Sequence, residues 1–232
     1  MSDEPLAIAR PFLMPLMSTA YLVRAGADVV VVDAGLPQTA PALIRAVARF
    51  GTPRAILVTH AHYDHVGGAA ALAAATGARV HASDHEADEM ARGHAGARFE
   101  GKRNIRGLIF TPFVRLERNR TVPPVIDCAR VRDGDLLPIG EGVRVVALPG
   151  HTIGQVGYLF EGTGDFFVGD AFASIVRPGR PPWHEDEAAE LASLRRIAGL
   201  SWSRLHPGHG GPVERPAFER FLARLPKEPR RG

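Results

Sequence analysis

The chain has 232 residues, of which 45% are hydrophobic and 23% charged, a composition typical of one sizeable globular domain or at most two small ones. The formal charge of +3 comes without a basic run interleaved with aromatic residues, so nucleic acid is not an expected partner. Cys128 is the only cysteine, which excludes an intramolecular disulfide, and no long apolar segment predicts a membrane span; we therefore expect a cytoplasmic protein.

The first part of the chain alternates short apolar runs with helical patterns. The runs at 21–24 and 29–33 predict a hairpin, because a turn of small and polar residues separates them. Further strands are expected at 55–58 and 79–82, and helices at 41–50, at 69–75 and from Ser83 or Asp84 to Met90. That alternation indicates an α/β layered domain.

The most informative stretch follows the strand expected at 55–58. It reads Thr59-His60-Ala61-His62-Tyr63-Asp64-His65-Val66-Gly67-Gly68 and places four side chains able to bind metal close together. Imidazole with carboxylate suits zinc, iron, manganese or cobalt, whereas closed structural zinc sites are rich in thiolate. A lone histidine there would more often pack in a core or lie on a surface loop. Three histidines and an aspartate at a strand end predict a metal site.

Residues 93–127 differ from the rest of the chain, because they mix Gly, Arg, Phe and Pro without a clean period. A segment of this length inside a compact domain is more often a lid or a substrate-facing insertion than a plain connection. We expect that role here. The apolar clusters of the segment favour a substrate with a hydrophobic part.

The second half of the chain is richer in strands. We expect strands at 130–135, 136–139, 143–148, 155–160, 166–168 and 203–205, and helices at 185–199 and 216–225. Three strands end at potential metal ligands, His151, Asp170 and His209. Each alone could be an ordinary turn residue, but with the central motif they give five histidines and two aspartates on loops after strands. Seven donors exceed the needs of one tetrahedral ion and suit two ions that share a bridging carboxylate.

These motifs resemble those of the metallo-β-lactamase-fold superfamily, in the branch of glyoxalase II-like hydrolases and related lactonases, from Tyr21 to Gly211. The resemblance implies a single domain over residues 1–232, built as a four-layer αββα sandwich of the α/β class with the metal site at one edge. Matched position by position, it implies that one ion is held by His60, His62 and His151. The second ion is held by Asp64, His65 and His209, and Asp170 bridges both. Asp33 corresponds to the family's early aspartate, which supports the site; zinc is the expected metal, with iron or manganese as alternatives.

The resemblance also implies a mechanism. Two ions lower the pKa of a bridging water towards ~7, and the resulting hydroxide attacks the carbonyl carbon of a lactone, ester or thioester. Asp64 is the expected catalytic residue, which orients the nucleophile or, with only the first ion bound, accepts its proton. Thr59 and Thr152 are expected either to hydrogen-bond around the ligands or simply to pack. Residues 171–173 lack the tyrosine that lactonases of this fold often carry, and the helical extension of glyoxalase II does not follow His209. The choice among these substrate classes therefore stays open.

Two other kinds of function remain open. A mononuclear-iron dioxygenase acting on glutathione persulfide uses a subset of the same ligands, and one iron per chain with oxygen consumption distinguishes it from a hydrolase. A non-catalytic binding protein with this fold would be expected to have lost ligands, whereas all seven are present. We expect a small-molecule substrate and no membrane partner, and a homodimer is left open.

Overall fold

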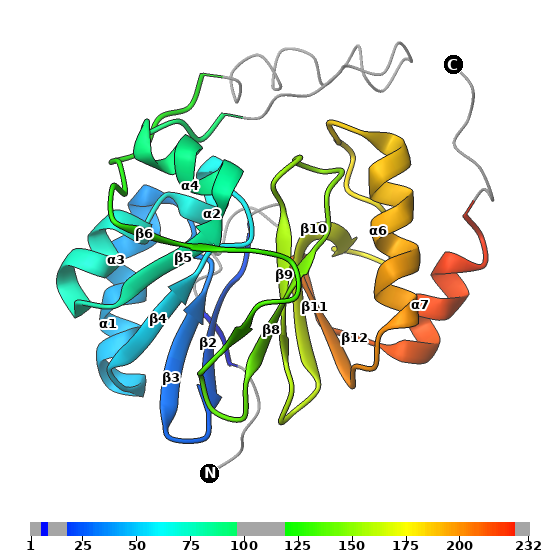
Figure 1. The fold of residues 1–232 in the computed structure, drawn as a ribbon, viewed down its shortest axis with the longest axis horizontal. Helices are drawn as coiled ribbons and strands as arrows, with labels where there is room; N and C mark the ends of the chain where they lie inside the picture. Colours follow the sequence, from blue (N-terminus) through cyan, green and yellow to red (C-terminus); the bar gives the residue numbers. More distant parts are fainter. Residues whose placement is uncertain (1–5, 9–17, 97–118, 226–232) are drawn as a thin grey trace.

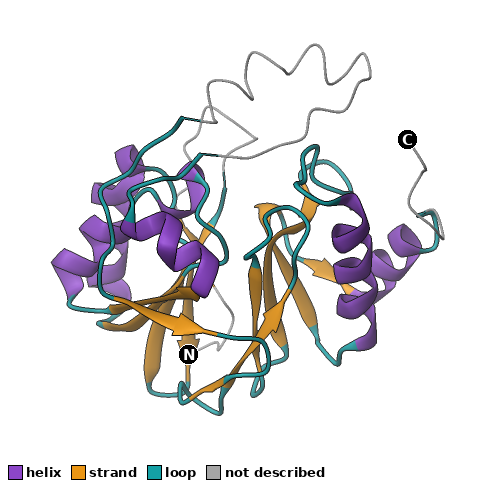
Figure 2. Ribbon diagram, turned by 45° about the horizontal axis from the view of Figure 1, so that its top comes forward, coloured by secondary structure: helices purple, strands orange, loops and turns teal. Residues whose placement is uncertain are grey.

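The computed structural model describes residues 6–8, 18–96 and 119–225, whose strands form two six-stranded sheets. The first sheet has the strand order β1 (Leu6–Ile8), β2 (Ala20–Ala25), β3 (Asp28–Val32), β4 (Pro53–Leu57), β5 (Arg79–Ser83) and β6 (Cys128–Val131). The second has the order β12 (Val213–Glu214), β11 (Arg204–Gly210), β10 (Asp165–Ser174), β9 (Val156–Phe160), β8 (Val143–Ala147) and β7 (Leu136–Leu137). The two sheets face each other across the middle of the molecule (Figures 1 and 2).

Helices lie on the outer sides of both sheets (Figure 2). Those of the first half are η1 (Pro37–Thr39), α1 (Ala40–Phe50), α2 (Tyr63–Val66), α3 (Ala69–Thr76) and α4 (Asp84–Ala91). Those of the second half are α6 (Glu187–Gly199) and α7 (Arg215–Leu222). The predicted four-layer αββα sandwich is therefore confirmed.

Alternation along the strands explains why the layers hold together. In β4, Ala55 and Leu57 point into the apolar core between the two sheets, whereas Ile56 points to the core under the helices of the first half. The second half repeats this arrangement, because Phe167 packs between the sheets and Phe166 packs under α6 and α7. The inner strands of each sheet are buried on both faces, so strands such as β3 and β9 are almost entirely apolar rather than alternately polar.

Strand direction brings the ends of several strands to one edge of the sandwich. β3, β4 and β5 run parallel to one another, and β10 runs parallel to β11. β9 is antiparallel to both β8 and β10, so β8 and β10 run in the same direction. The segments that follow β3, β4 and β8, and the last residues of β10 and β11, therefore carry their side chains to the same edge.

Most predicted elements agree with the structure, and two differences affect the site. β10 runs to Ser174 and β11 to Gly210, whereas the sequence predicted strands that stop at 168 and 205. Parallel pairing continues past the Gly-Asp and Pro-Gly steps because the β10–β11 register shifts between Phe167 and Ala173. Asp170 and His209 thus lie within strands, and the prediction that they sit on loops was wrong.

Smaller differences concern element ends. Residues 132–135 form a turn rather than part of a strand, and the last helix ends at Leu222. The short strands β1 and β12 were not predicted. Ser83, one of two predicted caps, is the N-cap of α4, and its hydroxyl accepts a hydrogen bond from the Glu86 amide.

The lid predicted at 93–127 stays a prediction, because 97–118 lie outside the described residues. Its two described ends lie together, since His94 forms an isolated β-bridge with Thr121. Within the described part of the chain, no helix is long and apolar enough to cross a membrane.

Candidate metal centre

All seven predicted ligands lie together at one edge of the sandwich. His60 and His62 follow β4, Asp64 and His65 lie on the single turn of α2, and His151 follows β8. Asp170 and His209 come from β10 and β11. Their ligand atoms form three overlapping groups, each compact enough for one ion, namely His60–His62–His151, His60–His65–Asp170 and Asp64–His65–His209.

The Gly67-Gly68 pair lets α2 lie close to the loop that follows β3. A Cβ on Gly67 would lie 2.3 Å from Pro37 Cδ, and a Cβ on Gly68 would lie 2.4 Å from the carbonyl oxygen of Ala34. The Ala34 amide donates to the carbonyl of His65 at 2.6 Å, which fixes α2 against this loop. Glycine at both positions therefore allows the approach that places Asp64 and His65 at the edge.

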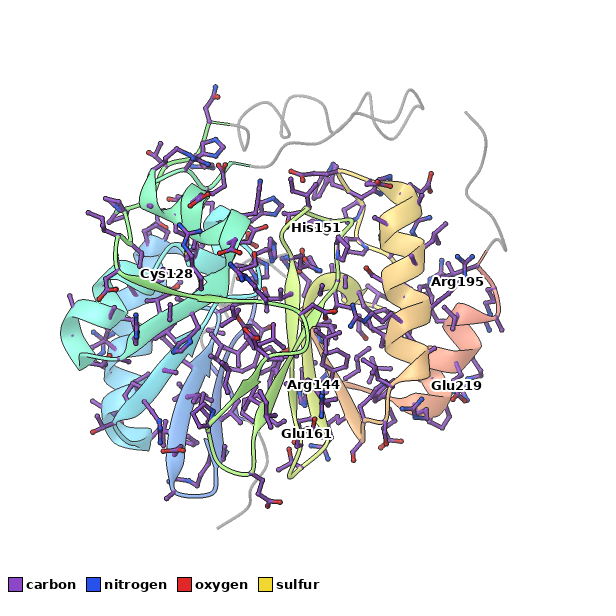
Figure 3. All side chains as sticks on the ribbon, in the orientation of Figure 1. Cys128, Arg144, His151, Glu161, Arg195 and Glu219 are labelled. Carbon is purple, nitrogen blue, oxygen red and sulfur yellow. The ribbon has the colours of Figure 1, made fainter. Side chains whose placement is uncertain are left out.

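The first group consists of three buried or nearly buried imidazoles. His62 Nδ1 lies 3.1 Å from His60 Nε2 and 3.0 Å from His151 Nε2. The other ring nitrogen of His151, Nδ1, donates to the carbonyl of Trp183 at 2.9 Å, which turns Nε2 toward the group. Figure 3 shows His151 at the edge of the second sheet that faces the first half of the chain.

The group formed by Asp64, His65 and His209, called the second group from here on, is more open to solvent. His209 Nε2 lies 3.4 Å from Asp64 Oδ2, and His65 Nε2 lies 3.9 Å from the same oxygen. The side chains of Asp64 and His209 are 26% and 15% exposed, whereas that of His65 is fully buried. Access from solvent is therefore on the side of Asp64 and His209.

Asp170 lies between the two groups. Its Oδ2 is 3.5 Å from His151 Nε2 and 3.2 Å from His209 Nε2, and its Oδ1 is 3.5 Å from His65 Nε2. One carboxylate thus reaches ligands of both groups, as a bridging ligand must.

The donor set fits divalent metal ions. Ligand nitrogens ~2.0–2.1 Å from a tetrahedral zinc ion are about 3.3 Å apart, close to the separations within these groups. Asp170 Oδ1 and His65 Nε2 are buried without a hydrogen-bond partner in the described structure, although a buried polar atom is costly unless something binds it. Nitrogen and oxygen donors without thiolate suit zinc, iron or manganese.

The pKa values of the histidines are shifted in different directions in the two groups. Burial lowers the pKa of His60 and His62 well below the usual range, and burial likewise lowers the pKa of His151. These rings are therefore neutral near pH 7, which is the form that binds metal.

In the second group, burial opposes the charged form of His65, but the carboxylates of Asp170, Asp64 and Asp33 outweigh it and raise the pKa of His65 to about 10. Burial alone would raise the pKa of Asp170, yet His209, His65 and His151 hold it well below its usual range. The ionised carboxylates that favour a proton on His65 would equally attract a divalent cation.

Asp33 and Thr59 lie behind the ligands, as expected of supporting residues. Asp33 accepts a hydrogen bond from His65 Nδ1 at 2.8 Å, and also accepts from the Thr59 amide at 2.8 Å. The Thr59 hydroxyl donates to Asp33 Oδ2 at 2.9 Å and lies 3.0 Å from His60 Nδ1. This series of hydrogen bonds fixes which ring nitrogen of His60 and of His65 faces the site.

Thr152 has a different partner from the one expected. Its hydroxyl donates to Oε1 of the buried Glu86 at 2.6 Å rather than to a ligand. Tyr63, in the same motif, is not one of the ligands. Its hydroxyl accepts a hydrogen bond from Gln38 at 3.0 Å, and the guanidinium of Arg120 lies over its ring.

Sequence reasoning missed two contributors to the site, namely Glu86 and Gly208. A Cβ on Gly208 would lie 2.3 Å from Asp170 Oδ1, so this position must stay small. The Pro-Gly step before His209 offered a signal for Gly208. Glu86 offered none, because a glutamate in the first turn of a helix is usually solvated.

Comparison with known proteins identifies the family to which the chain is similar. Residues 13–209 match the family model described as "Metallo-beta-lactamase superfamily". A hydroxyacylglutathione hydrolase of Rhodobacter capsulatus is 34% identical over 171 residues, which cover 72% of this chain and 53% of the relative. A second, from Anaeromyxobacter dehalogenans, is 33% identical over 202 residues, which cover 85% of this chain and 63% of the relative. The chain thus spans between about half and two thirds of the length of these two relatives.

A solved structure supports the fold. A metallo-beta-lactamase family protein from Thermus thermophilus is 26% identical and superposes with a TM-score of 0.68. The match covers 95% of this chain and 78% of that protein, so it includes both halves of the sandwich.

Proposed function

The chain belongs to the metallo-beta-lactamase superfamily, and from this premise we propose that it is a metal-dependent hydrolase with two divalent ions, zinc first and iron or manganese as alternatives. The observation that carries the proposal is the position of Asp170, whose oxygens lie 3.2–3.5 Å from ligands of both groups. A carboxylate in that position suits two neighbouring ions better than one. The preserved set of seven donors argues against a protein that retains only the fold.

Each ligand group has its own part in the proposed site. His60, His62 and His151 would hold the first ion, Asp64, His65 and His209 would hold the second, and Asp170 would serve both. Divalent ions so placed supply a nucleophilic water at neutral pH and an electrophile for a carbonyl oxygen. The chain's own contribution is to fix the ligands and to exclude water from the buried first group.

Asp64 is the residue we assign to catalysis. Its Oδ2 lies 3.4 Å from His209 Nε2, on the side of the site that solvent and substrate reach. A carboxylate there can orient the attacking water and accept its proton. The main chain beneath it is held by Ser18, whose hydroxyl donates to the Asp64 carbonyl.

We propose a carbonyl substrate of the thioester, ester or lactone class, with thioesters to be tested first because two relatives are named hydroxyacylglutathione hydrolases. Exposed apolar side chains that follow the ligands His151 and Asp170 in the sequence support a substrate with a hydrophobic part. Ile153, two residues after His151, is 58% exposed, and Val176, shortly after the end of β10, is 95% exposed. Apolar side chains so placed can contact the non-reacting part of a substrate.

The test is metal stoichiometry of freshly purified protein, combined with hydrolysis of a panel of thioesters, lactones and aryl esters. We expect about two zinc, manganese or iron ions per chain. Asp170→Ala should lose both hydrolysis and at least one ion. A single iron, no hydrolysis of any panel member and oxygen uptake with glutathione persulfide would overturn the hydrolase in favour of a mononuclear-iron dioxygenase.

A further inference from the structure

We propose that Glu86 is a positioning residue that ties together the two loops of the first metal site, one carrying His60 and His62 and the other carrying His151. The inference rests on the two-ion site proposed above and deepens it, because it assigns a residue that holds the geometry of one ion. Glu86 acts through the main chain and the hydroxyl beside the ligands rather than through a ligand side chain.

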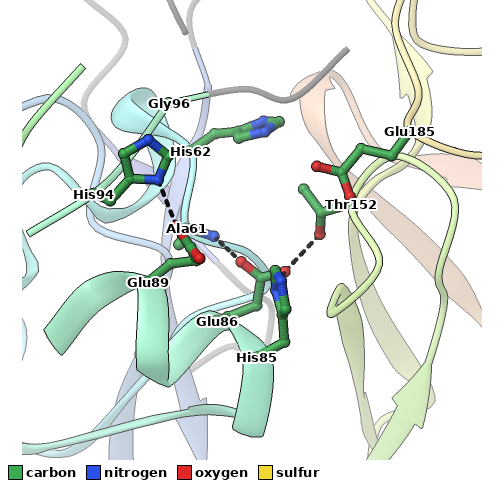
Figure 4. Close-up of a pocket in the computed structure, with 9 residues that line it drawn as sticks. All are labelled: Ala61, His62, His85, Glu86, Glu89, His94, Gly96, Thr152 and Glu185. Atoms are coloured by element: carbon green, nitrogen blue, oxygen red, sulfur yellow. Dashed lines mark hydrogen bonds and ion pairs between the residues drawn. The ribbon is translucent and has the colours of Figure 1, made fainter. Parts of the chain in front are cut away.

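The contacts of Glu86 reach both halves of the sandwich. Its side chain is only 2% exposed, and its Oε2 accepts a hydrogen bond from the Ala61 amide at 2.8 Å. Its Oε1 accepts from the Thr152 hydroxyl at 2.6 Å. Figure 4 shows the carboxylate between these two partners. Ala61 lies between His60 and His62, and Thr152 follows His151, so one carboxylate holds the chain next to all three imidazoles of the first group.

The helix that carries Glu86 is itself fixed to the second loop. The N-cap Ser83 donates its hydroxyl to the carbonyl of Gly154 at 2.6 Å. A Cβ on Gly154 would lie 2.6 Å from Glu86 Oε1 and 2.8 Å from His85 Cβ, so the loop at 151–154 lies directly against the first turn of α4. α4 is therefore a rigid support that belongs to the first half of the chain and contacts the second.

A carboxylate suits this position because both its oxygens are acceptors and both its partners are donors. Removing it would leave the Ala61 amide and the Thr152 hydroxyl buried without partners, and each such loss is costly. The two loops would then be free to shift. His62 Nδ1 lies only 3.0 Å from His151 Nε2, across the two loops, so a small shift changes the coordination geometry.

The second group depends on another carboxylate. His65 is supported by Asp33 at 2.8 Å, whereas the hydrogen bonds that Glu86 accepts from Ala61 and Thr152 lie beside the first group. The inference therefore makes a selective prediction. Loss of Glu86 should lower the affinity for the first ion and leave the affinity for the second unchanged.

The test measures the two stepwise zinc affinities by competition with a chromophoric chelator, and the absorption spectrum of the cobalt(II)-substituted protein. His151→Gln and Asp64→Asn serve as reference variants that assign each step to one group. Glu86→Ala should lower the affinity of the first site by ~10–100-fold, alter the cobalt bands of that site, and leave the second step within experimental error.

Two conservative variants provide the matched controls. Glu86→Gln should stay near wild type, because its carbonyl oxygen can accept from the Ala61 amide while its amide donates to the Thr152 hydroxyl. Thr152→Ser keeps the donor and should also stay near wild type. Thr152→Val keeps the shape, removes the donor, and should show a smaller loss in the same direction as Glu86→Ala. If Glu86→Ala does not fold, the comparison of Thr152→Val with Thr152→Ser carries the test.

Three results would overturn the proposal, namely an unchanged first site in Glu86→Ala and Thr152→Val, equal losses at both sites, or a Glu86→Gln variant as weak as Glu86→Ala. These outcomes differ from failure of the proposed function. If the wild-type protein binds one ion only, the two-ion hydrolase is contradicted, whereas the comparison of Glu86 variants at the three-histidine site still decides whether Glu86 positions it.

Discussion

The imidazole of His65 and the carboxylate of Asp33 form a buried pair in which Nδ1 and Oδ2 lie 2.8 Å apart. The pair sets the orientation of the ring, so that the opposite nitrogen faces Asp170 at 3.5 Å. Asp33 adopts a left-handed backbone conformation with φ of 58°, which few residues other than glycine, asparagine and aspartate tolerate. The turn after β3 therefore gives Asp33 a position that only a short polar side chain fits well.

We predict that Asp33→Asn lowers the affinity of the second metal by ~10–100-fold. Asparagine tolerates the same backbone conformation, so the change removes charge and one acceptor rather than the turn. Stepwise zinc titration checks this. The control is Asp28→Asn, at the other end of β3, where the carboxylate contacts Arg54 and the Gly140 amide instead of a ligand. Unchanged zinc binding by Asp33→Asn would show that Asp33 does not support His65.

The metal-binding residues of the site could be predicted from the sequence, but the full length of the strands that carry Asp170 and His209 could not. All four donors in the central motif are local, since His60 and His62 lie in one loop and Asp64 and His65 lie on the helical turn that follows it. The extent of β10 and β11 was not predicted, because it depends on parallel pairing between strands distant in the chain, and Gly169 and Pro207 suggested strand ends. Pairing of this kind leaves no periodic signal.

Glu86 was missed for a related reason. Its two partners lie 25 and 66 residues away, and they are a main-chain amide and a hydroxyl rather than a charged side chain. Nothing in the local sequence of α4 separates such a glutamate from a solvated one. The burial of Glu86 depends on the packing of the two halves of the sandwich, which the local sequence does not reveal.

We predict different outcomes for two histidines that are equally buried, His151 at 2% and His206 at 3% exposure. His151→Gln removes a proposed ligand and should reduce the bound metal from about two ions to about one. His206→Gln removes an imidazole whose Nε2 lies 2.7 Å from Asp165, away from the three ligand groups, and should keep both ions. Both variants should lose about 1–3 kcal/mol of unfolding free energy, because each leaves a buried partner unpaired.

The comparison is made by metal analysis and by denaturant unfolding of the metal-free proteins. Similar stability with different metal content would support His151 as a ligand rather than a packing residue. Loss of metal in both variants, or in neither, would contradict that assignment.

We predict that the single thiol reacts slowly and plays no part in the site. Cys128 lies on β6 (Figure 3), and burial raises the pKa of its thiol to about 11. Only the thiolate reacts, so alkylation should accelerate about tenfold per pH unit until the pH nears that pKa. At neutral pH we expect a rate roughly 10–100-fold below that of an ordinary thiol, since the greater nucleophilicity of a basic thiolate offsets part of its scarcity.

Timed iodoacetamide labelling followed by mass spectrometry measures this rate, with urea-unfolded protein as the control for an ordinary thiol. The alkylated protein should keep its metal and its activity. Rapid labelling at pH 7 would contradict the raised pKa of the thiol. Release of metal on labelling would show that Cys128 is coupled to the site.

We predict that Gly208→Ala damages the site although it adds only one methyl group. The new Cβ would lie 2.3 Å from Asp170 Oδ1 and 2.6 Å from His65 Cε1, both distances too short for unbonded atoms. Since Gly208 lies on β11, which pairs with β12 and β10 inside the second sheet, the strand has little room to withdraw. The carboxylate and the ring must therefore move. We expect loss of the second ion and of hydrolysis.

Gly211→Ala is the matched control, because a Cβ at Gly211 has no atom within 4 Å among the described residues. The two variants make the same chemical change a few residues apart, so a difference between them reports the contact with Asp170 and His65 and not a general cost of removing glycine. Metal analysis and thermal unfolding of both proteins check it. Equal metal content in the two variants would mean that Asp170 and His65 can move without losing the ions, and the bridging position assigned to Asp170 would then have to be abandoned.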